Sequence, residues 1–405
     1  MANTFTGDFE TIWAREQQEV FYKKNVAQEV ANTSYSAMMT SWDTFKRTYR
    51  STNVNNAPAI YTRGTDVTLS DKTDTAESLT INSSFVEAFY IDDLDEIQSK
   101  YSLAVRYGKD AGESLKAQVD ADVLYQVVNA TSTVDDGTIA GTAGNGIALT
   151  TANVFSVITA VTKKLNKLNI NDMDRVGVIS PEFEEIISQY YGAKVTDLGD
   201  NVAENGYFTK IGGFKLFVSN SLTGKAVLAL ATTPTDADTV VIQGVTFTFK
   251  TTLWSTAGNV LIGGSADVAR ANLTALVNAP ATTTANGVAL SATNSQNFLA
   301  RAVATNDNTA DTMTLWYKGI GVLTVSETLT DGTDTWTTTL QKQLQLFGVA
   351  KDCTTMIMQK APKVKQKDNP LRDGYNYINT VLYGIKTFDD QKDKMVAVEI
   401  KSSGF

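Results

Sequence analysis

The residues of this sequence best suited to acid–base chemistry form three pairs of adjacent aspartates: Asp92-Asp93, Asp135-Asp136 and Asp389-Asp390. A glycoside hydrolase needs two carboxyl groups that face each other about 5 to 9 Å apart, one of them in an apolar pocket that raises its pKa. Adjacent acids more often cap turns and helices. The spacing of the acids also resembles neither a calcium loop nor a two-metal cluster. We therefore interpret the three pairs as caps.

Two absences narrow the chemistry further. The sequence contains no histidine, and Cys353 is its only cysteine. This removes the Ser-His-Asp triad, the Cys-His pair, histidine-ligated zinc, internal disulfides and thiolate metal clusters. The glycines of residues 137–146 lack the Gly-Lys-Ser/Thr of a phosphate loop, so we interpret this segment as a surface loop. We expect no enzyme, and therefore no catalytic residues, no cofactor and no metal.

Length and composition fit a folded protein with several cores. The chain has 405 residues, of which 42% are hydrophobic and 20% are charged, enough for two or three cores. The net charge of −9 argues against wrapping nucleic acid, although it permits a place beside packaged nucleic acid. We find neither a run of about 20 apolar residues that could span a membrane nor a signal peptide at MANTFTGDFETIW. The expected compartment is a cytoplasm.

The elements that must position any site are organised around a predicted helix from Asp92 to Ala130. Its apolar face consists of Leu94, Ile97, Tyr101, Tyr107, Ala111, Leu115 and Val119. Its charged face consists of Lys109, Glu113, Lys116 and Asp120. Asp93 and Glu96 resemble a capping box. Gly108 and Gly112 are weak points where we expect a bend.

The residues before this helix form two stretches of different composition. Phe9–Ala31 and Tyr35–Tyr49 are amphipathic and predict two helices, the second with Trp42 among its large apolar residues. Residues 51–90 are polar and predict extended chain, with strands on either side of a turn at Arg63-Gly64. So little apolar content cannot bury a core of its own, so this segment is either flexible or held by another molecule.

The remainder predicts an α/β region interrupted by an inserted module. A helix is expected from Val154 to Leu168, a strand over Arg175–Ile179, and a helix after Ser180 as N-cap. From about residue 223 to 347 charges become sparse, and this module predicts a hairpin at Gln243-Gly244 and a helix from Ser265. After it, Ala361–Lys367 is a basic run expected in a proline-bounded loop, and the chain closes with strands.

The order of these parts resembles a known family. The segments that carry the resemblance are SLAVRYGKDAGESLKAQVDADVLYQ, VGVISPEFEEIISQYYGAK, ENGYFTKIGGFKLFVSNSL and YINTVLYGIKTFDDQKDKMVAVEIK. Together they resemble the major capsid protein of tailed bacteriophages with the Hong Kong 97 fold, over about residues 1–222 and 347–405. The implied fold class is α+β. The implied divisions are an N-terminal arm (1–50), an extended loop or E-loop (51–90), a peripheral domain with a spine helix (91–139 and 376–405), an axial domain (140–222 and 347–375) and an insertion domain (223–346).

The resemblance also implies a function and partners. Such proteins self-assemble as pentamers and hexamers into an icosahedral shell around double-stranded DNA, which they bind without sequence specificity. The implied partners are copies of the chain, a separate scaffolding protein and a portal protein, with no membrane; a decoration protein and Lys–Asn crosslinks are left open. The implied location is the virion capsid, assembled in the host bacterial cytoplasm. The candidate intersubunit contacts are Trp13, Trp42, Arg63, Asp66, Lys72, Lys363, Lys365 and Lys367.

Two other functions compete with this one. The Thr- and Gly-rich module is also compatible with another virion or surface structural protein, such as a tail-tube, fibre or adhesin subunit. A carboxylate-based hydrolase is the third reading, and it would need a pocket that joins acids distant in sequence.

Overall fold

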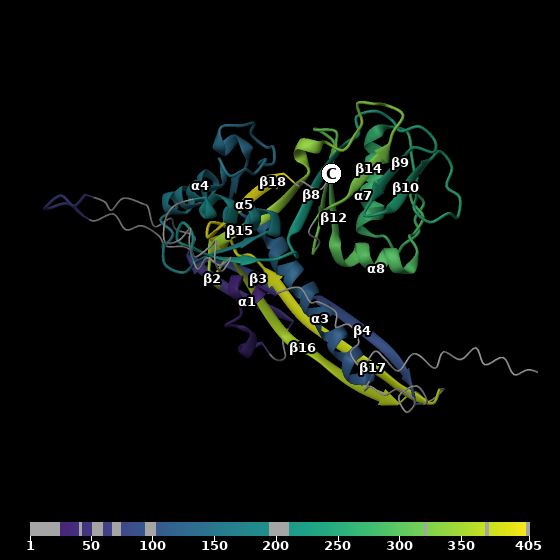
Figure 1. Cartoon of the computed structure of the whole chain (residues 1–405), viewed down its shortest axis with the longest axis horizontal. Helices are drawn as coiled ribbons and strands as arrows, with labels where there is room; N and C mark the ends of the chain where they lie inside the picture. The colour runs from purple at the N-terminus through teal and green to yellow at the C-terminus, as the bar shows by residue number, and fades with distance from the viewer. Residues whose placement is uncertain are drawn as a thin grey trace, which may run out of the picture.

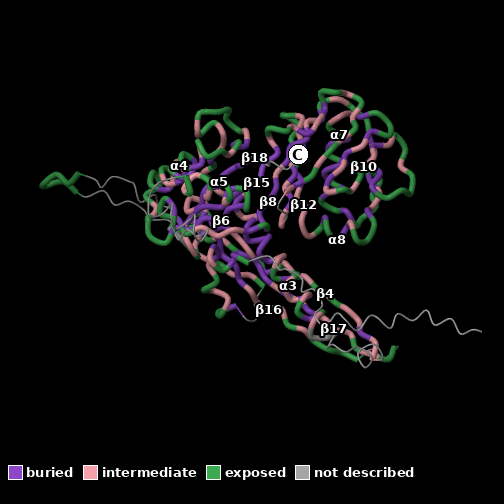
Figure 2. Tube along the Cα trace, viewed as in Figure 1, coloured by how far each residue is buried: buried purple, intermediate pink, exposed green. Residues whose placement is uncertain are grey.

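A computed structural model describes residues 25–39, 43–50, 60–66, 74–93, 103–193, 210–319, 322–368 and 372–401. Two compact bodies lie side by side, one around helices α4 and α5 and one around helices α7 and α8, and a long arm built from helix α3 and strands β4, β16 and β17 extends away from them (Figure 1). Buried residues gather in the two bodies, whereas the outer part of the arm is mostly half-buried or exposed (Figure 2). The arm is therefore the part of the molecule with the least core of its own.

One eight-stranded sheet joins the two bodies. Its main path has the order β12-β13-β8-β15-β18-β5, and β6 and β7 branch from β15. Its strands are β5 (Ser132–Val134), β6 (Arg175–Ile179), β7 (Phe214–Val218), β8 (Thr223–Ala229), β12 (Ala302–Asp307), β13 (Thr312–Tyr317), β15 (Lys342–Val349) and β18 (Met395–Lys401). Nearly every residue of β15 and β18 is buried, as expected for strands that are covered on both faces.

Alternate residues of the central strands face two different cores. Phe347 and Val396 pack with helices α4 (Val154–Lys167) and α5 (Pro181–Gly192) on one face of the sheet. Leu346 and Met395, their sequence neighbours, pack with helix α3 (Leu103–Tyr125) on the other face. The predicted helices and the strand Arg175–Ile179 are confirmed here, including Ser180, whose Oγ accepts a hydrogen bond from the backbone N–H of Phe183.

The arm is a second sheet, of order β1-β16-β17-β4, packed against α3. Its strands are β1 (Ala31–Asn32), β4 (Ser83–Asp92), β16 (Thr354–Asp368) and β17 (Gly374–Lys386). A Cβ added at Gly108 would lie 3.4 Å from Val364, and one at Gly112 would lie 3.7 Å from Asn379. The two glycines therefore face the sheet, and α3 continues as one α-helix through both of them.

The predicted faces of the long helix are partly correct. Ala111, Leu115 and Val119 are buried, and Lys116 forms the expected ion pair with Glu113 at 2.7 Å. Tyr107, predicted to be buried, is 48% exposed. Asp92, the predicted start of the helix, is instead the last residue of strand β4. Residues 94–102, including Glu96 of the expected capping box, lie outside the described residues.

Asp120 corrects the predicted charged face most clearly, because its exposed fraction is 0%. Its Oδ1 accepts hydrogen bonds from the backbone N–H groups of Val26 and Ala27, both at 2.7 Å. These residues open the short helix α1 (Ala27–Val30), which covers this side of α3. The carboxylate thus satisfies two buried backbone donors that come from the distant N-terminal segment.

Asp122, two residues further on, attaches the other body to α3. Its Oδ1 accepts a hydrogen bond from Nζ of Lys318 at 2.7 Å, and its Oδ2 accepts one from the hydroxyl of Tyr383 at 2.5 Å. Burial and the adjacent Asp122 carboxylate raise the pKa of Tyr383, so its hydroxyl remains a donor. Gln118, one turn earlier, donates to the carbonyl of Ala300 at 3.1 Å.

The body that residues 223–346 contribute has its own apolar cluster, whose described members all lie between Ala226 and Trp336. A four-stranded sheet of order β11-β10-β9-β14 covers this cluster. The elements are β9 (Thr239–Ile242), β10 (Val245–Lys250), β11 (Asn259–Leu261), α7 (Ala266–Asn278), α8 (Ala292–Arg301) and β14 (Val325–Thr328). The predicted hairpin is confirmed, with left-handed φ at Gln243 and Gly244. Strand β8 pairs with β15, so this body shares the central sheet.

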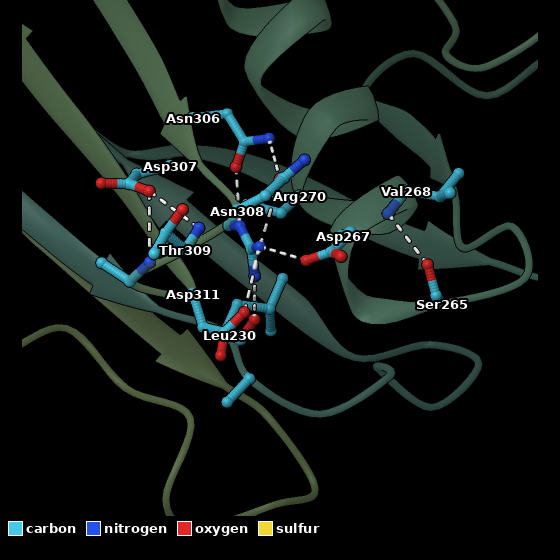
Figure 3. A network of polar contacts seen from close by, with 12 residues as sticks. Leu230, Ser265, Asp267, Val268, Arg270, Asn306, Asp307, Asn308, Thr309 and Asp311 are labelled. Carbon is cyan, nitrogen blue, oxygen red and sulfur yellow. Dashed lines mark hydrogen bonds and ion pairs between the residues drawn. The ribbon is translucent and has the colours of Figure 1, made fainter.

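A buried arginine organises polar groups inside this body. The side chain of Arg270 is 0% exposed and points from α7 toward the turn between β12 and β13 (Figure 3). It donates hydrogen bonds to Asp267, Asn306, Asn308, Asp311 and the carbonyl of Leu230. The guanidinium occupies the space between these acids, so the cluster is a paired structural network.

Two secondary-structure predictions are wrong. Tyr35–Tyr49, expected as a helix, contains a 3-10 turn (Ser36–Met38) and strand β2 (Thr44–Arg50), which pairs with β3 (Asp74–Thr80). The large residues of this segment fit a half-covered strand as well as a helix. The basic run Ala361–Lys367, expected in a loop, belongs to β16. The strand can include Pro362 because the pairing register with β17 shifts at that position.

The remaining elements are short. They are the 3-10 turns Gln126–Asn129, Asp136–Ile139 and Thr338–Leu340, and helix α9 (Asp389–Lys392). The segment 137–146 forms the predicted surface loop.

The Asp120 contact predicts a large stability effect from a small change. Replacement of Asp120 by alanine leaves the N–H groups of Val26 and Ala27 buried without their acceptor, at a cost of about 2–4 kcal/mol. Urea unfolding of the unassembled chain, followed by circular dichroism, measures this loss. Asp43→Ala is the matched control, because Asp43 is exposed, and we expect its free energy of unfolding to remain within about 0.5 kcal/mol of the parent value. An equally small effect at Asp120 would contradict the anchoring role.

Candidate assembly surfaces

A column of lysines occupies one face of the arm sheet. Val364 and its cross-strand partner Asn379 face α3, so the alternate residues Lys363, Lys365 and Lys367 face away from it. All three lysines are exposed. Alternate residues of a strand lie about 6.7 Å apart, so the three lysines form a regular column of positive charges on this face.

The adjoining positions on this face carry no acid. The cross-strand partners of the three lysines are Thr380, Ile378 and Asn376, and the next strand presents Val86, Ala88 and Tyr90. Arg372 adds a further positive charge, 5.7 Å from the centre of the Tyr90 ring. The acids near this face lie at the outer end of the sheet: Asp92, whose Oδ2 accepts a hydrogen bond from the hydroxyl of Tyr90 at 3.2 Å, and Asp368 and Asp373, which follow Lys367 and Arg372 in the sequence. The face is therefore positively charged although the chain as a whole is acidic.

The inner end of the same face is covered by the chain's own strands β2 and β3. Leu79 packs with Ile357 and Leu382 in one apolar cluster. A Cβ added at Gly384 would lie 2.6 Å from the carbonyl oxygen of Thr80, so the glycine permits this close approach. Arg47 of β2 forms an ion pair with Asp390 at 2.6 Å. Beyond this cover the face is open, and Val86 is 63% exposed.

Residues 60–66, between β2 and β3 in sequence, are all exposed. Ile60 is 96% exposed and Tyr61 is 68% exposed. The turn expected at Arg63-Gly64 is present, with Gly64 at φ +88° and a hydrogen bond from the N–H of Thr65 to the carbonyl of Thr62. Residues 60–62 are not part of a strand, and Val67 and Leu69, expected in the second strand, lie outside the described residues.

The structure separates the predicted contact residues into three groups. Lys363, Lys365 and Lys367 lie together on the arm, and Arg63 and Asp66 lie on the exposed segment 60–66. Trp13, Trp42 and Lys72 lie outside the described residues. That the three lysines share one sheet face was not predicted, although their i, i+2, i+4 spacing is a strand signal.

The aspartate pairs serve the structure as caps and ion-pair partners. The Asp135 side chain accepts hydrogen bonds from the N–H groups of Thr138 and Gly144, which lowers its pKa despite partial burial. Asp136 accepts one from the N–H of Thr142. Asp389 and Asp390 begin α9, and Asp390 pairs with Arg47. Asp92 accepts a hydrogen bond from Tyr90, and the capping partner expected for Asp93 is undescribed.

Two of the cavities in the described part of the chain have acidic residues in their walls. A cavity of about 300 Å³ is lined by Glu182 and Lys401 among mostly apolar residues. A second, of about 340 Å³, is lined by Glu29 and Asp174 together with Arg175, Lys210, Lys215 and Lys351. Within the described ranges no three cysteine, aspartate or glutamate side chains are placed to hold a metal ion. None of the described helices has the length and apolar content needed to cross a bilayer.

The same fold occurs in structures from bacteriophages. The chain matches a structure of Mycobacterium phage Che8 with a TM-score of 0.57 and 12% identity, over 98% of each chain. It matches the capsid structure of cyanophage P-SCSP1u with a TM-score of 0.54 and 14% identity, over 98% of this chain and 94% of that chain. The mature capsid of bacteriophage PhiM1 gives a TM-score of 0.51 and 10% identity, over 96% and 90%.

No protein-family model and no curated protein matches the sequence. The structural matches nevertheless cover nearly the whole chain, including residues 223–346. The predicted fold class, the α+β fold of phage capsid proteins, is confirmed.

Burial makes a sharp prediction for the single thiol. Cys353 is fully buried, and desolvation together with the neighbouring Asp352 raises its pKa to about 12. Because its pKa is raised, the thiol stays protonated below that pH. We expect no reaction of the native chain with a thiol reagent at pH 8 and one equivalent of reaction in urea, measured by absorbance. Prompt labelling of the native chain would show that this core opens readily.

Proposed function

We propose that this chain is the major capsid protein of a tailed bacteriophage, with a structural role and no catalytic one. Copies assemble as pentamers and hexamers into an icosahedral shell that encloses double-stranded DNA. The observation that carries the proposal is the capsid fold, shared over nearly the whole chain with two phage capsid structures. The arm sheet supports the proposal, because the outer end of one of its faces is exposed, and a charged sheet face with apolar neighbours is typical of a contact surface.

The segments of the chain are assigned to the parts of the capsid fold as follows. Residues 1–50 form the N-terminal arm and 51–90 the extended loop. Residues 91–139 and 376–405 form the peripheral domain, 140–222 and 347–375 the axial domain, and 223–346 the insertion domain. Assembly takes place in the host bacterial cytoplasm with a separate scaffolding protein and a portal protein. Many modest interfaces, each near the usual size of about 1,600 Å², sum to a stable shell.

The cationic arm face receives the extended loop of an adjacent copy. The inner end of the face is already covered by the copy's own β2 and β3, so the open outer end continues an existing contact surface. The loop offers Asp66 for the lysines and exposed Ile60 for Val86. Trp13, Trp42, Arg63 and Lys72 complete the proposed intersubunit contacts.

Assembly of the purified chain tests the function directly. Co-expressed with the scaffolding protein of the same phage, the chain should form closed shells that sediment rapidly and are visible in negative-stain images. Tubes or trimers would point to another virion structural protein, and a product that remains monomeric under these conditions would overturn the proposal.

Charge reversal of the lysine column tests the loop contact. K363E/K365E/K367E should raise the critical concentration for shell assembly by at least about tenfold, because the three positive charges that attract Asp66 of the neighbouring loop become negative and repel it. The matched control K363R/K365R/K367R keeps the charges and should assemble like the parent chain. Adding Asp66→Lys to the reversed variant should recover part of the assembly. Normal assembly of the reversed chain would contradict the loop contact and leave the capsid function standing.

A further inference from the structure

The two surface helices of the proposed axial domain carry opposite charges in separate places. The last two turns of α4 contain Lys163, Lys164 and Lys167, and the first turn of α5 and the residue after it contain Glu182, Glu184 and Glu185. Lys163, Lys167, Glu182 and Glu185 are exposed, whereas Lys164 is half-buried and donates to the carbonyl of Thr133. None of the six forms an ion pair with another described residue.

The geometry of the helices keeps the two charged groups apart. The first turn of α4 contacts the last turn of α5, where the rings of Phe155 and Tyr190 stack with their centroids 6.0 Å apart. The end of α4 lies beside the start of β6, where Arg175 donates to the Asn166 side chain. Helix α5 begins after the other end of that five-residue strand, about 13 Å further on. The basic end of α4 and the acidic end of α5 therefore lie apart within one copy, and no ion pair joins these described residues.

Neighbouring charged residues reduce the net charge at each of these two helix ends but do not cancel it. Asp172 and Asp174 follow α4, but Arg175 adds a buried positive charge there, donating to the Asn166 side chain at 2.7 Å. Lys401 shares a cavity with Glu182. An excess of two positive charges remains at the end of α4, and an excess of two negative charges remains at the start of α5.

Helix dipoles account for the signs of these charges but not for their number or exposure. An acid in the first turn and a base in the last turn each stabilise a helix by about 0.3–1 kcal/mol, and the effect is confined to those turns. Lys163 lies outside the last turn of α4 and faces solvent, directly opposite the buried residues of that helix.

We propose that the basic end of α4 in one copy binds the acidic end of α5 in the next copy around each capsomer ring. This inference rests on the proposed capsid function. A closed ring is built from heterologous contacts, in which one surface of each copy meets a different surface of its neighbour. Two separated patches of opposite charge on one domain meet that requirement, and complementary charge also orients the copies as they associate.

Charge reversal on one side and then on both tests the pairing. K163E/K167E and E182K/E185K should each raise the critical concentration for shell assembly at least about tenfold. The four-fold variant, K163E/K167E/E182K/E185K, which carries all four substitutions, should return the critical concentration to the parent value. A loss of helix-dipole stabilisation alone would lower the unfolding free energy of each variant without such restoration. The matched control K163R/K167R keeps the charges and should assemble like the parent chain.

A mixture of the two single-sided variants gives a second readout. One variant has two acidic ends and the other two basic ends, so favourable contacts form only where the variants alternate around a ring. Alternation is compatible with six copies and incompatible with five. We expect hexamers without pentamers, seen as sheets or tubes in electron micrographs and as six-membered rings in native mass spectra.

Three results would overturn the pairing while leaving the capsid function intact: normal shells from both single-sided variants, no recovery in the four-fold variant, or closed shells from the mixture. Absence of shells from the parent chain would instead overturn the capsid function itself.

Discussion

Two buried carboxylates on one helix connect the parts of this protein. Asp120 and Asp122 are two residues apart, so their side chains leave α3 about 200° apart and reach opposite sides of it. Asp120 binds the backbone of Val26 and Ala27, whereas Asp122 binds Lys318 and Tyr383. The helix is thereby attached to the N-terminal segment, to the body contributed by residues 223–346, and to the arm sheet. Buried acids are tolerated at such positions because every one of these contacts supplies a hydrogen-bond donor.

In the described part of the chain, this arrangement leaves the outer end of the arm sheet covered on one face only. α3 buries one face of the sheet, and β2 and β3 bury only the inner end of the other face. The open remainder is held soluble by Lys363, Lys365 and Lys367, and charged residues on an outer strand also discourage uncontrolled strand pairing. A surface of this kind is stable in an isolated copy and still available to a neighbour, which is what stepwise assembly of a shell requires.

The sequence predicted well what local periodicity decides and poorly what distant segments decide. Helix α5 with its Ser180 cap and the hairpin at Gln243-Gly244 follow from neighbouring residues alone. Asp120 looked exposed because the segment that covers it lies about 94 residues earlier in the chain. The lysine column was expected in a loop because Pro362 suggested one, and a register shift in a long hairpin accommodates that proline. The contact of Asp120 with Val26 and Ala27 leaves no local signal, whereas the alternate spacing of the lysines did indicate a strand.

The shared sheet determines how a force on one part reaches the others. Strand β8 belongs to the body of residues 223–346 and pairs with β15, and β15 also pairs with β6 and β18 beneath α4 and α5. Movement of that body relative to α3 would break the contacts of Asp122 and shear this sheet, both of which are buried. We therefore expect the bodies to move together with α3 as one unit, and the exposed segment 60–66 and the outer arm to adjust most easily. These two parts are the surfaces that the proposed capsid function assigns to contacts between copies.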